Sequence, residues 1–213
     1  LRLDGTFDVG PGLVQLLRNG GIMLAADRVT PTLLLPGETL TGQGNHSGAI
    51  TALAGSSIAA TGGDMELGDA TSFAGFLSQG SVDTQGNTVT LKSLSFANLA
   101  GQTTVGGGTL AAQNGILLAA GAQLTGNGNV DAAVVGQAGS SITAQGGDLT
   151  VGDASSAFGF AFDGALATGA NTVTLRSAGL AGLGAATTMN GGRLDSSNGI
   201  QLAAGRTLTG DGT

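Results

Sequence analysis

The sequence predicts an all-β protein, a parallel β-helix (β-solenoid) with coils of about 20–22 residues and four coils in each long repeat. Three observations predict this fold: an 84-residue internal repeat, a glycine-rich composition poor in aromatic residues, and short strand-like runs interrupted by Gly and Asn. The β-helix is expected to be right-handed, because crossover connections between parallel strands are almost always right-handed.

The repeat is most visible in NGILLAAGAQLTGNG at 114–128. It returns in the next copy as NGIQLAAGRTLTGDG at 198–212, and a shorter version, LLLPGETLTGQG, precedes it at 33–44. The segments 45–128 and 129–212 align without a gap, and just over half of the aligned positions are identical. The chain is therefore predicted to be one continuous solenoid over 1–213, with a partial repeat at 1–44 and full repeats at 45–128 and 129–212.

A shorter pattern divides each repeat. I-x-x-x-A-G-x-x-[IL]-x-[AG]-x-G, with Val allowed at its first position, starts at Ile50, Ile116, Val134 and Ile200, so a short interval lies between two equal long ones. If the short interval is one coil and each long interval is three, every repeat holds four coils. Their boundaries are then expected near Asn45, Met65, Asn87 and Thr109.

Within one coil, residues 116–118 and 123–125 are predicted strands, and the Gly- and Asn-containing segments after them are predicted turns. Ile116 and Leu124 are expected to face the core. Earlier in the chain, residues 13–18 have an apolar spacing compatible with one helical turn or with a solenoid strand.

The composition excludes several classes of protein. Gly occupies 41 positions but without a three-residue period, so the chain is not collagen, and 41 % hydrophobic residues are too many for a disordered linker. A net charge of −7 with seven Lys and Arg offers no basic surface for nucleic acid. No apolar run reaches the roughly 18 residues that span a bilayer. Without an initiator Met or a signal peptide, the chain is expected to be an internal segment or a mature product.

Four carboxylates are candidate ligands for a metal. Asp64 and Asp69 recur as Asp148 and Asp153 in the pattern GGD-x-x-x-GD. Such oxygen ligands suit Ca²⁺, although acceptance of hydrogen bonds from turn amides is the favoured role. The basic position shared by Lys92 and Arg176 is expected to face solvent.

Other residues have a structural interpretation beside a functional one. His46 is expected to lie in a solvent-facing loop, and four Asn at 42-residue spacing are expected to stack or to cap corners (Asn45, Asn87, Asn129, Asn171). Six Phe are expected to pack in the core, with an exposed ridge for lateral association as the alternative (Phe73, Phe76, Phe96, Phe158, Phe160, Phe162). Thr at equivalent positions suggests an ice-binding ladder, but the match recurs once per repeat (Thr41, Thr125, Thr209).

The motif L-T-G-x-G-N ends the coils at 40–45 and 124–129, and it diverges only at the last residue in 208–213. With A-G-x-x-[IL] at the corner, it resembles the passenger regions of autotransporter and filamentous-haemagglutinin-type bacterial surface proteins. The resemblance implies a β-helix, export to the cell surface or the extracellular space, a role in adhesion or matrix structure, and no catalytic residues.

The function expected from the sequence is structural and adhesive, not enzymatic, with rods or filaments formed by end-to-end stacking. The partners expected are further solenoid repeats and, beyond them, surface receptors or glycans, with no cofactor. The alternatives are a β-helix polysaccharide lyase or hydrolase, which needs convergent Asp and Lys or Arg in a cleft, and a calcium- or ice-binding solenoid. An uncapped solenoid end exposes strand edges, so the ends are expected to meet more solenoid.

Overall fold

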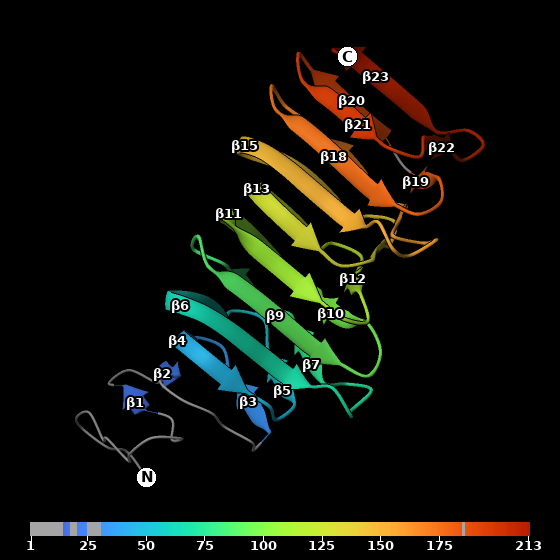
Figure 1. The fold of residues 1–213 in the computed structure, drawn as a ribbon. Helices are drawn as coiled ribbons and strands as arrows, with labels where there is room; N and C mark the ends of the chain where they lie inside the picture. Colours follow the sequence, from blue (N-terminus) through green and yellow to red (C-terminus); the bar gives the residue numbers. More distant parts are fainter. Residues whose placement is uncertain (1–14, 18–20, 25–30, 185) are drawn as a thin grey trace.

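The structure, a computed structural model, describes residues 15–17, 21–24, 31–184 and 186–213. In this part of the chain every regular element is a β-strand, and the strands form two sheets of 14 and nine members, called sheet A and sheet B (Figure 1). The strands stack as a parallel β-solenoid, which confirms the predicted fold class.

Sheet B consists of three-residue strands, each paired in parallel with its neighbour in the stack. Its members are β3 (Thr32–Leu34), β5 (Ile50–Ala52), β7 (Phe76–Ser78), β10 (Ala97–Leu99), β12 (Ile116–Leu118), β14 (Val134–Gly136), β16 (Phe160–Phe162), β19 (Ala181–Leu183) and β22 (Ile200–Leu202).

Sheet A contains the longer strands. Its members are β1 (Gln15–Leu17), β2 (Gly21–Leu24), β4 (Thr39–His46), β6 (Ser57–Asp69), β8 (Ser81–Asp83), β9 (Thr88–Ser93), β11 (Gln102–Ala112), β13 (Gln123–Asp131), β15 (Ser141–Asp153), β17 (Ala165–Ala167), β18 (Thr172–Ser177), β20 (Ala186–Asn190), β21 (Arg193–Ser196) and β23 (Thr207–Asp211).

One coil is a sheet B strand followed by the sheet A strands up to the next sheet B strand. Numbering these from β3 gives coils 1 to 9, so β5–β6 form coil 2 and β14–β15 form coil 6. The starting positions of the sheet B strands show that coil 1 is the shortest of the first four coils and coil 2 the longest, and the same order recurs in coils 5 to 8. The mean coil length lies within the predicted range, while the individual coils are unequal.

The long coils 2 and 6 owe their length to two insertions. In the middle of β6, four residues (61–64) lie opposite the single residue Gln43 of β4, which makes a bulge. After the end of β6, a six-residue loop (70–75) replaces the two- or three-residue corners of the other coils. Coil 6 repeats both features at 145–148 and 154–159. The gapless repeat therefore preserves the irregularities of the coils as well as their strands.

The first described strands differ from the rest. β1 pairs with β2 antiparallel, and β2 then pairs with β4 in parallel. The segment 13–18 thus contains a strand where the sequence left a helical turn and a strand open, but this strand does not continue the parallel stack. Much of the predicted partial repeat (1–14, 18–20 and 25–30) lies outside the described residues.

The core lies between the two sheets and consists of columns of small aliphatic side chains. Ile116 and Leu124 are fully buried, as predicted. Leu124 pairs in register with Thr103 of the preceding coil and Ile142 of the following coil. Alternation of buried and partly exposed residues along each strand places every second side chain in such a column.

His46 lies in this core with 1 % of its surface exposed, so the prediction of a solvent-facing loop was wrong. β4 extends through His46, and strand alternation turns its side chain inward. Nδ1 lies 3.0 Å from the Gly48 carbonyl oxygen, to which it donates because a carbonyl can only accept, and Nε2 forms a hydrogen bond with the Thr32 hydroxyl at 2.8 Å. In the next repeat, Thr32 corresponds to Ile116 and His46 to Val130, and these two apolar side chains are also buried. The apolar Val130 at the position equivalent to His46 was therefore a sequence signal for burial, and the prediction did not use it.

Candidate functional site at the corner loops

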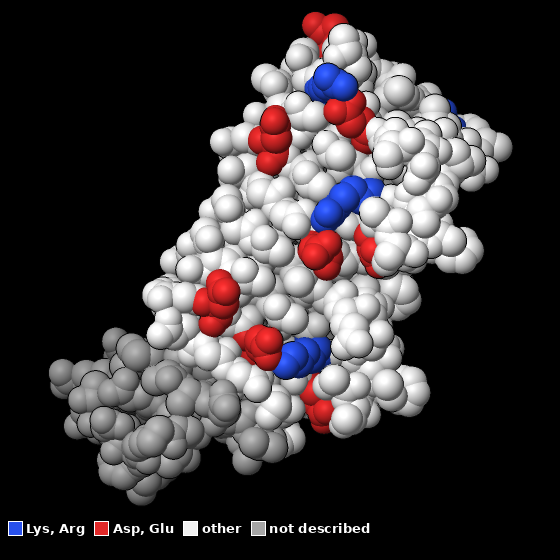
Figure 2. All heavy atoms as spheres, in the orientation of Figure 1, with Lys and Arg blue, Asp and Glu red and all other residues white. Residues whose placement is uncertain are grey.

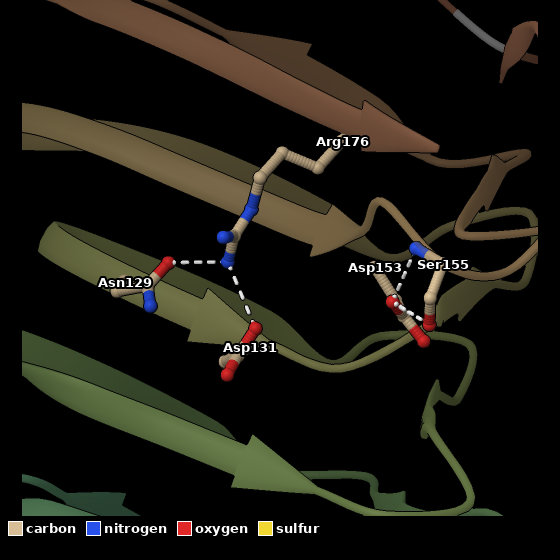
Figure 3. A network of polar contacts seen from close by, with 5 residues as sticks. All are labelled: Asn129, Asp131, Asp153, Ser155 and Arg176. Carbon is tan, nitrogen blue, oxygen red and sulfur yellow. Dashed lines mark hydrogen bonds and ion pairs between the residues drawn. The ribbon is translucent and has the colours of Figure 1, made fainter. Parts of the chain in front are cut away.

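The two six-residue loops, 70–75 and 154–159, are the largest interruptions of the described solenoid between sheet A and sheet B. Each begins with an Asp at the end of a long strand. Oδ1 of Asp69 accepts hydrogen bonds from the backbone N of Thr71 at 2.8 Å and from its hydroxyl at 2.6 Å. Asp153 does the same with Ser155, at 2.8 and 2.7 Å (Figure 3). These Asp side chains therefore fix the entry of each loop.

Their hydrogen bonds hold both Asp side chains in the ionised form. The Thr71 hydroxyl, and then the Thr71 amide, lower the pKa of Asp69 below its ordinary value of 3.8. The Ser155 hydroxyl and amide lower the pKa of Asp153 in the same way, with a smaller contribution from the charge of Arg176. The loop entries are thus acceptor sites at neutral pH.

The far side of each loop is bound to the next coil. The Ser72 carbonyl accepts from the backbone N of Leu94 at 2.9 Å, and the Ser156 carbonyl accepts from the backbone N of Ala178 at 2.8 Å. The hydroxyl of Ser93 donates to the Phe73 carbonyl at 3.2 Å. With an Asp at the entry and these bonds across the stack, each loop is held at both sides.

Each loop presents one phenylalanine ring to solvent. Phe73 is 76 % exposed and Phe158 is 77 % exposed, whereas Phe76 and Phe160, which follow them at the start of the next sheet B strand, are buried. The predicted core position is confirmed for Phe76, Phe160 and Phe162, and Phe160 and Phe162 lie with ring centroids 5.7 Å apart. It is wrong for Phe73 and Phe158, because their loops leave the stack, and for Phe96, which lies partly exposed in the three-residue corner after β9.

Neighbouring corners extend these two rings into a larger apolar surface. Leu94 and Phe96 in the corner after β9, and Leu180 in the corner after β18, are 45 %, 41 % and 54 % exposed. We call Phe73, Leu94, Phe96, Phe158 and Leu180 the corner ridge. In Figure 2 the charged side chains gather over sheet A, while the right-hand edge of the molecule is almost entirely uncharged.

The other repeated carboxylates lie elsewhere and serve the backbone. Oδ1 of Asp64 accepts from the backbone N of Thr88 at 2.7 Å, and Asp148 accepts from Thr172 at 2.7 Å. Asp64 and Asp69 stand at the two ends of one extended stretch of β6, a separation of roughly 16 Å. The structure does not bring the predicted calcium ligands together, and the described residues contain no group of three His, Cys, Asp or Glu placed to hold a metal.

The basic position has a different partner in each repeat. Lys92 forms an ion pair with Glu66 of the adjacent strand. Thr150 replaces Glu66 in the second repeat, and Arg176 instead reaches across Gly152 to Asp131 at 3.0 Å (Figure 3).

Nη2 of Arg176 also donates to Oδ1 of Asn129 at 2.8 Å. Both basic residues lie on the outer face of sheet A, as expected, but within specific contacts rather than free in solvent.

The four Asn at 42-residue spacing do not form one ladder. Asn87 and Asn171 cap corners, since their side-chain amides donate to the carbonyls of Ala60 and Ala144 at 2.9 and 3.2 Å. Asn45 and Asn129 lie within sheet A strands instead. Because the coils are unequal, half of the long repeat is not a whole number of coils, so equal spacing does not give equal position.

Threonines from non-equivalent positions come together on the outer face of sheet A, which the sequence interpretation missed. Thr104, Thr125 and Thr143 stand in register on three successive coils, and Thr188 pairs with Thr209. The repeat spacing alone concealed this row, because it compares residues four coils apart and never adjacent coils.

A shallow hollow of about 310 Å³ lies on the outer face of sheet B. It exists because Ala161 and Gly182 occupy the positions that Leu77 and Asn98 fill in the first repeat. Among the described residues that line it, Asp163 is the one charged side chain, and there is no Lys or Arg.

The fold and the corner loops together define a β-solenoid repeat protein with periodic apolar knobs. No protein-family model matches the chain, and it matches neither a curated protein nor a solved structure. Within the described ranges, the chain forms no helix of the length and apolarity needed to cross a bilayer.

Proposed function

We propose that the chain is a structural and adhesive segment of a secreted bacterial surface or matrix protein, in which it acts as a stiff rod. The observation that carries this proposal is the unbroken stack of nine coils with one continuous core. Nine coils at about 4.8 Å each give a rod of roughly 40 Å. The bacterial and extracellular setting rests on the resemblance of the L-T-G-x-G-N coils to autotransporter and filamentous-haemagglutinin-type passenger regions.

Stacking against a further coil is the second part of the proposal. Leu208 of coil 9 is 43 % exposed, whereas its equivalent Leu124, which has a coil on both sides, is fully buried. β23 pairs with β20 on one side only. Another coil placed on this edge would bury apolar surface and satisfy backbone groups, whether it came from the same chain or from another.

The proposal is non-enzymatic. A lyase or hydrolase would need a cleft in which Asp and Lys or Arg converge, and the described basic residues that form ion pairs lie on the outer face of sheet A. Surface receptors and glycans remain proposed partners, and the role of the rod is to present repeated surfaces to them at a distance from its attachment point.

Electron microscopy of the concentrated protein tests the rod. We expect rods, and filaments in which coils continue across the junction with a repeat of about 19 Å for four coils. The variant Leu208→Glu places a charge on the open edge and should abolish filaments while leaving single rods intact. Compact particles with a groove would contradict the proposal.

A second candidate function, ice binding, is favoured by the threonine row of Thr104, Thr125 and Thr143. The row is interrupted by Ala167, which pairs with Thr188 in the next coil. Thermal hysteresis of the purified chain, compared with that of Thr125→Val, tests it. Absence of hysteresis in the parent chain removes this candidate.

A further inference from the structure

The corner ridge is the apolar surface that the solenoid itself leaves uncovered. Phe73 and Phe158 are exposed by more than three quarters, yet their loops are anchored by Asp69 and Asp153 and by bonds to the next coil. A held loop presents its ring without an ordering cost on binding, which favours contact with a partner. Anchoring and exposure together therefore distinguish these rings from apolar residues that are exposed by chance.

The ridge alternates along the rod. Coils 2 and 6 contribute the six-residue loops, and the three-residue corners of coils 3 and 7 contribute Leu94, Phe96 and Leu180, which gives two knobs about 19 Å apart. Between them, the corners of coils 4 and 5, at 113–115 and 132–133, are short and carry no large apolar side chain. Knobs and gaps each occupy two coils, so a second rod of the same kind, shifted by two coils, would place its knobs in these gaps.

We propose that the corner ridge is a side-by-side contact between two copies of this solenoid, with the phenylalanine knobs of each copy seated against the short corners of the other. The gap is lined by Ala133, which is partly exposed, and by the exposed, uncharged Gln113 and Asn114, while Ala132 is buried in the core. Because one chain carries both a knob series and the matching gap, the surface is self-complementary.

The available area is sufficient for a weak contact. A phenylalanine ring buries on the order of 200 Å², so the two exposed rings supply about 300 Å² and the three flanking side chains bring the ridge to roughly 500–600 Å². Two copies together would bury about 1,000–1,200 Å², at the lower limit of specific interfaces. Each further repeat adds a knob and a gap, so affinity rises steeply with the number of repeats.

Charge also favours this edge. The chain carries a net charge of −7, which opposes self-association through most of its surface. Charged side chains gather over sheet A (Figure 2), whereas the corner residues 70–75, 94–96, 154–159 and 178–180 include no charged side chain. Contact through the ridge therefore desolvates few charges and keeps the acidic faces apart.

Sedimentation velocity over a concentration series compares the parent chain with Phe73→Ser/Phe158→Ser. We expect the parent to dimerise reversibly and the double variant to dimerise at least about a hundredfold more weakly, with an unchanged melting temperature because both rings are exposed. Leu33→Ser is the matched control, since Leu33 is 55 % exposed but lies on sheet B, away from the corner. It should leave dimerisation unchanged.

Disulfide trapping tests the interdigitation itself, and the chain has no cysteine that would interfere. A mixture of Ala74→Cys and Gln113→Cys chains should form mixed dimers faster than either forms homodimers, because a shift of two coils places the corner of coil 2 against the corner of coil 4. Predominant Ala74→Cys homodimers would contradict the knob-in-gap arrangement.

A parent chain that stays monomeric throughout the series would overturn the proposal. If that monomer bound zwitterionic lipid vesicles through Phe73 and Phe158, the ridge would be a membrane contact instead. Rod shape and end-to-end filaments are measured separately, on Leu208→Glu, so failure of the lateral contact leaves the proposed function standing.

Discussion

Truncation of one core leucine at two equivalent positions measures what a stacked coil contributes. Leu124 and Leu208 are the same residue in successive repeats, in the same L-T-G context. Leu124 lies between Thr103 and Ile142 and is fully buried, whereas Leu208 has Thr187 on one side only and is 43 % exposed. The variants Leu124→Ala and Leu208→Ala therefore differ in one respect, the presence of a coil on the second side.

The expected costs follow from burial. Leu124→Ala removes buried methyl groups and leaves a cavity between two coils that continue on both sides, which costs about 3–5 kcal/mol. Leu208→Ala loses only the part of the transfer free energy that the partly buried side chain had gained, about 1 kcal/mol, and solvent fills the space.

Urea unfolding followed by far-UV circular dichroism gives the free-energy difference, and hydrogen exchange shows where the chain opens. Solenoid coils can unfold in blocks, so exchange should rise around β13 in Leu124→Ala but only in coil 9 in Leu208→Ala. Equal destabilisation by the two variants would refute the reasoning, since it would mean that contact with a second coil adds nothing to the core.

Three further predictions concern single positions. Gly152→Ala should cost more than about 3 kcal/mol in the same urea assay or prevent folding, because its Cβ would lie 2.1 Å from the Arg176 carbonyl oxygen at a φ of +113°. Gly121→Ala is the control: Gly121 has a φ of +84° but no atom within 4 Å of the added Cβ, so this variant should cost about 1–2 kcal/mol. His46→Val should destabilise by about 1–3 kcal/mol because the buried Thr32 hydroxyl loses its partner, and Thr32→Ile/His46→Val should recover most of the loss in thermal melts. Asp153→Asn should lower the melting temperature at pH 7, and the effect should shrink as the pH is lowered below 3.8. The folded-state pKa of Asp153 is lowered, so its contribution to stability is present above the ordinary value of 3.8 and is lost as the pH falls through the lower folded value. An effect that stays the same at every pH would contradict this.

The sequence was sufficient for the architecture because strand alternation and the repeat are local or periodic signals. Glycine corners, the inward Ile116 and Leu124, and the mean coil length followed directly from them. The unequal coil lengths were not predicted, since the period of the long repeat fixes only the sum over four coils. The alternation phase along β4, which buries His46, depends on how far that strand extends, and its Gly-rich sequence does not mark the end.

Side-chain neighbours across the stack were the least predictable part. The register of adjacent coils decides that Thr104, Thr125 and Thr143 form a row, and that register depends on the bulges at 61–64 and 145–148. Exposure of Phe73 likewise depends on a loop leaving the stack. A run such as F-A-G-F contains one buried and one exposed ring with nothing in its composition to separate them.

Comparison of the two repeats shows that contacts persist where residues change. The buried polar pair of Thr32 and His46 becomes an apolar pair in the next copy, and both are packed. The ion pair of Lys92 with Glu66 becomes one of Arg176 with Asp131. The basic residue thus keeps an acidic partner, but the partner lies one coil away in the first case and two coils away in the second.

The exposed ring of the corner loop is the third change of this kind. Phe73 aligns with Ala157 and Ala74 with Phe158, so the ring moves by one position within the loop and is still more than three quarters exposed. In the first two cases the preserved property is a contact inside the molecule. Here the preserved property is exposure, which contributes nothing to the fold of a single rod. A ring that stays exposed after a change of position, and that contributes nothing to the core, is best explained by a contact with another molecule. The matching knobs and gaps of a second rod provide such a contact.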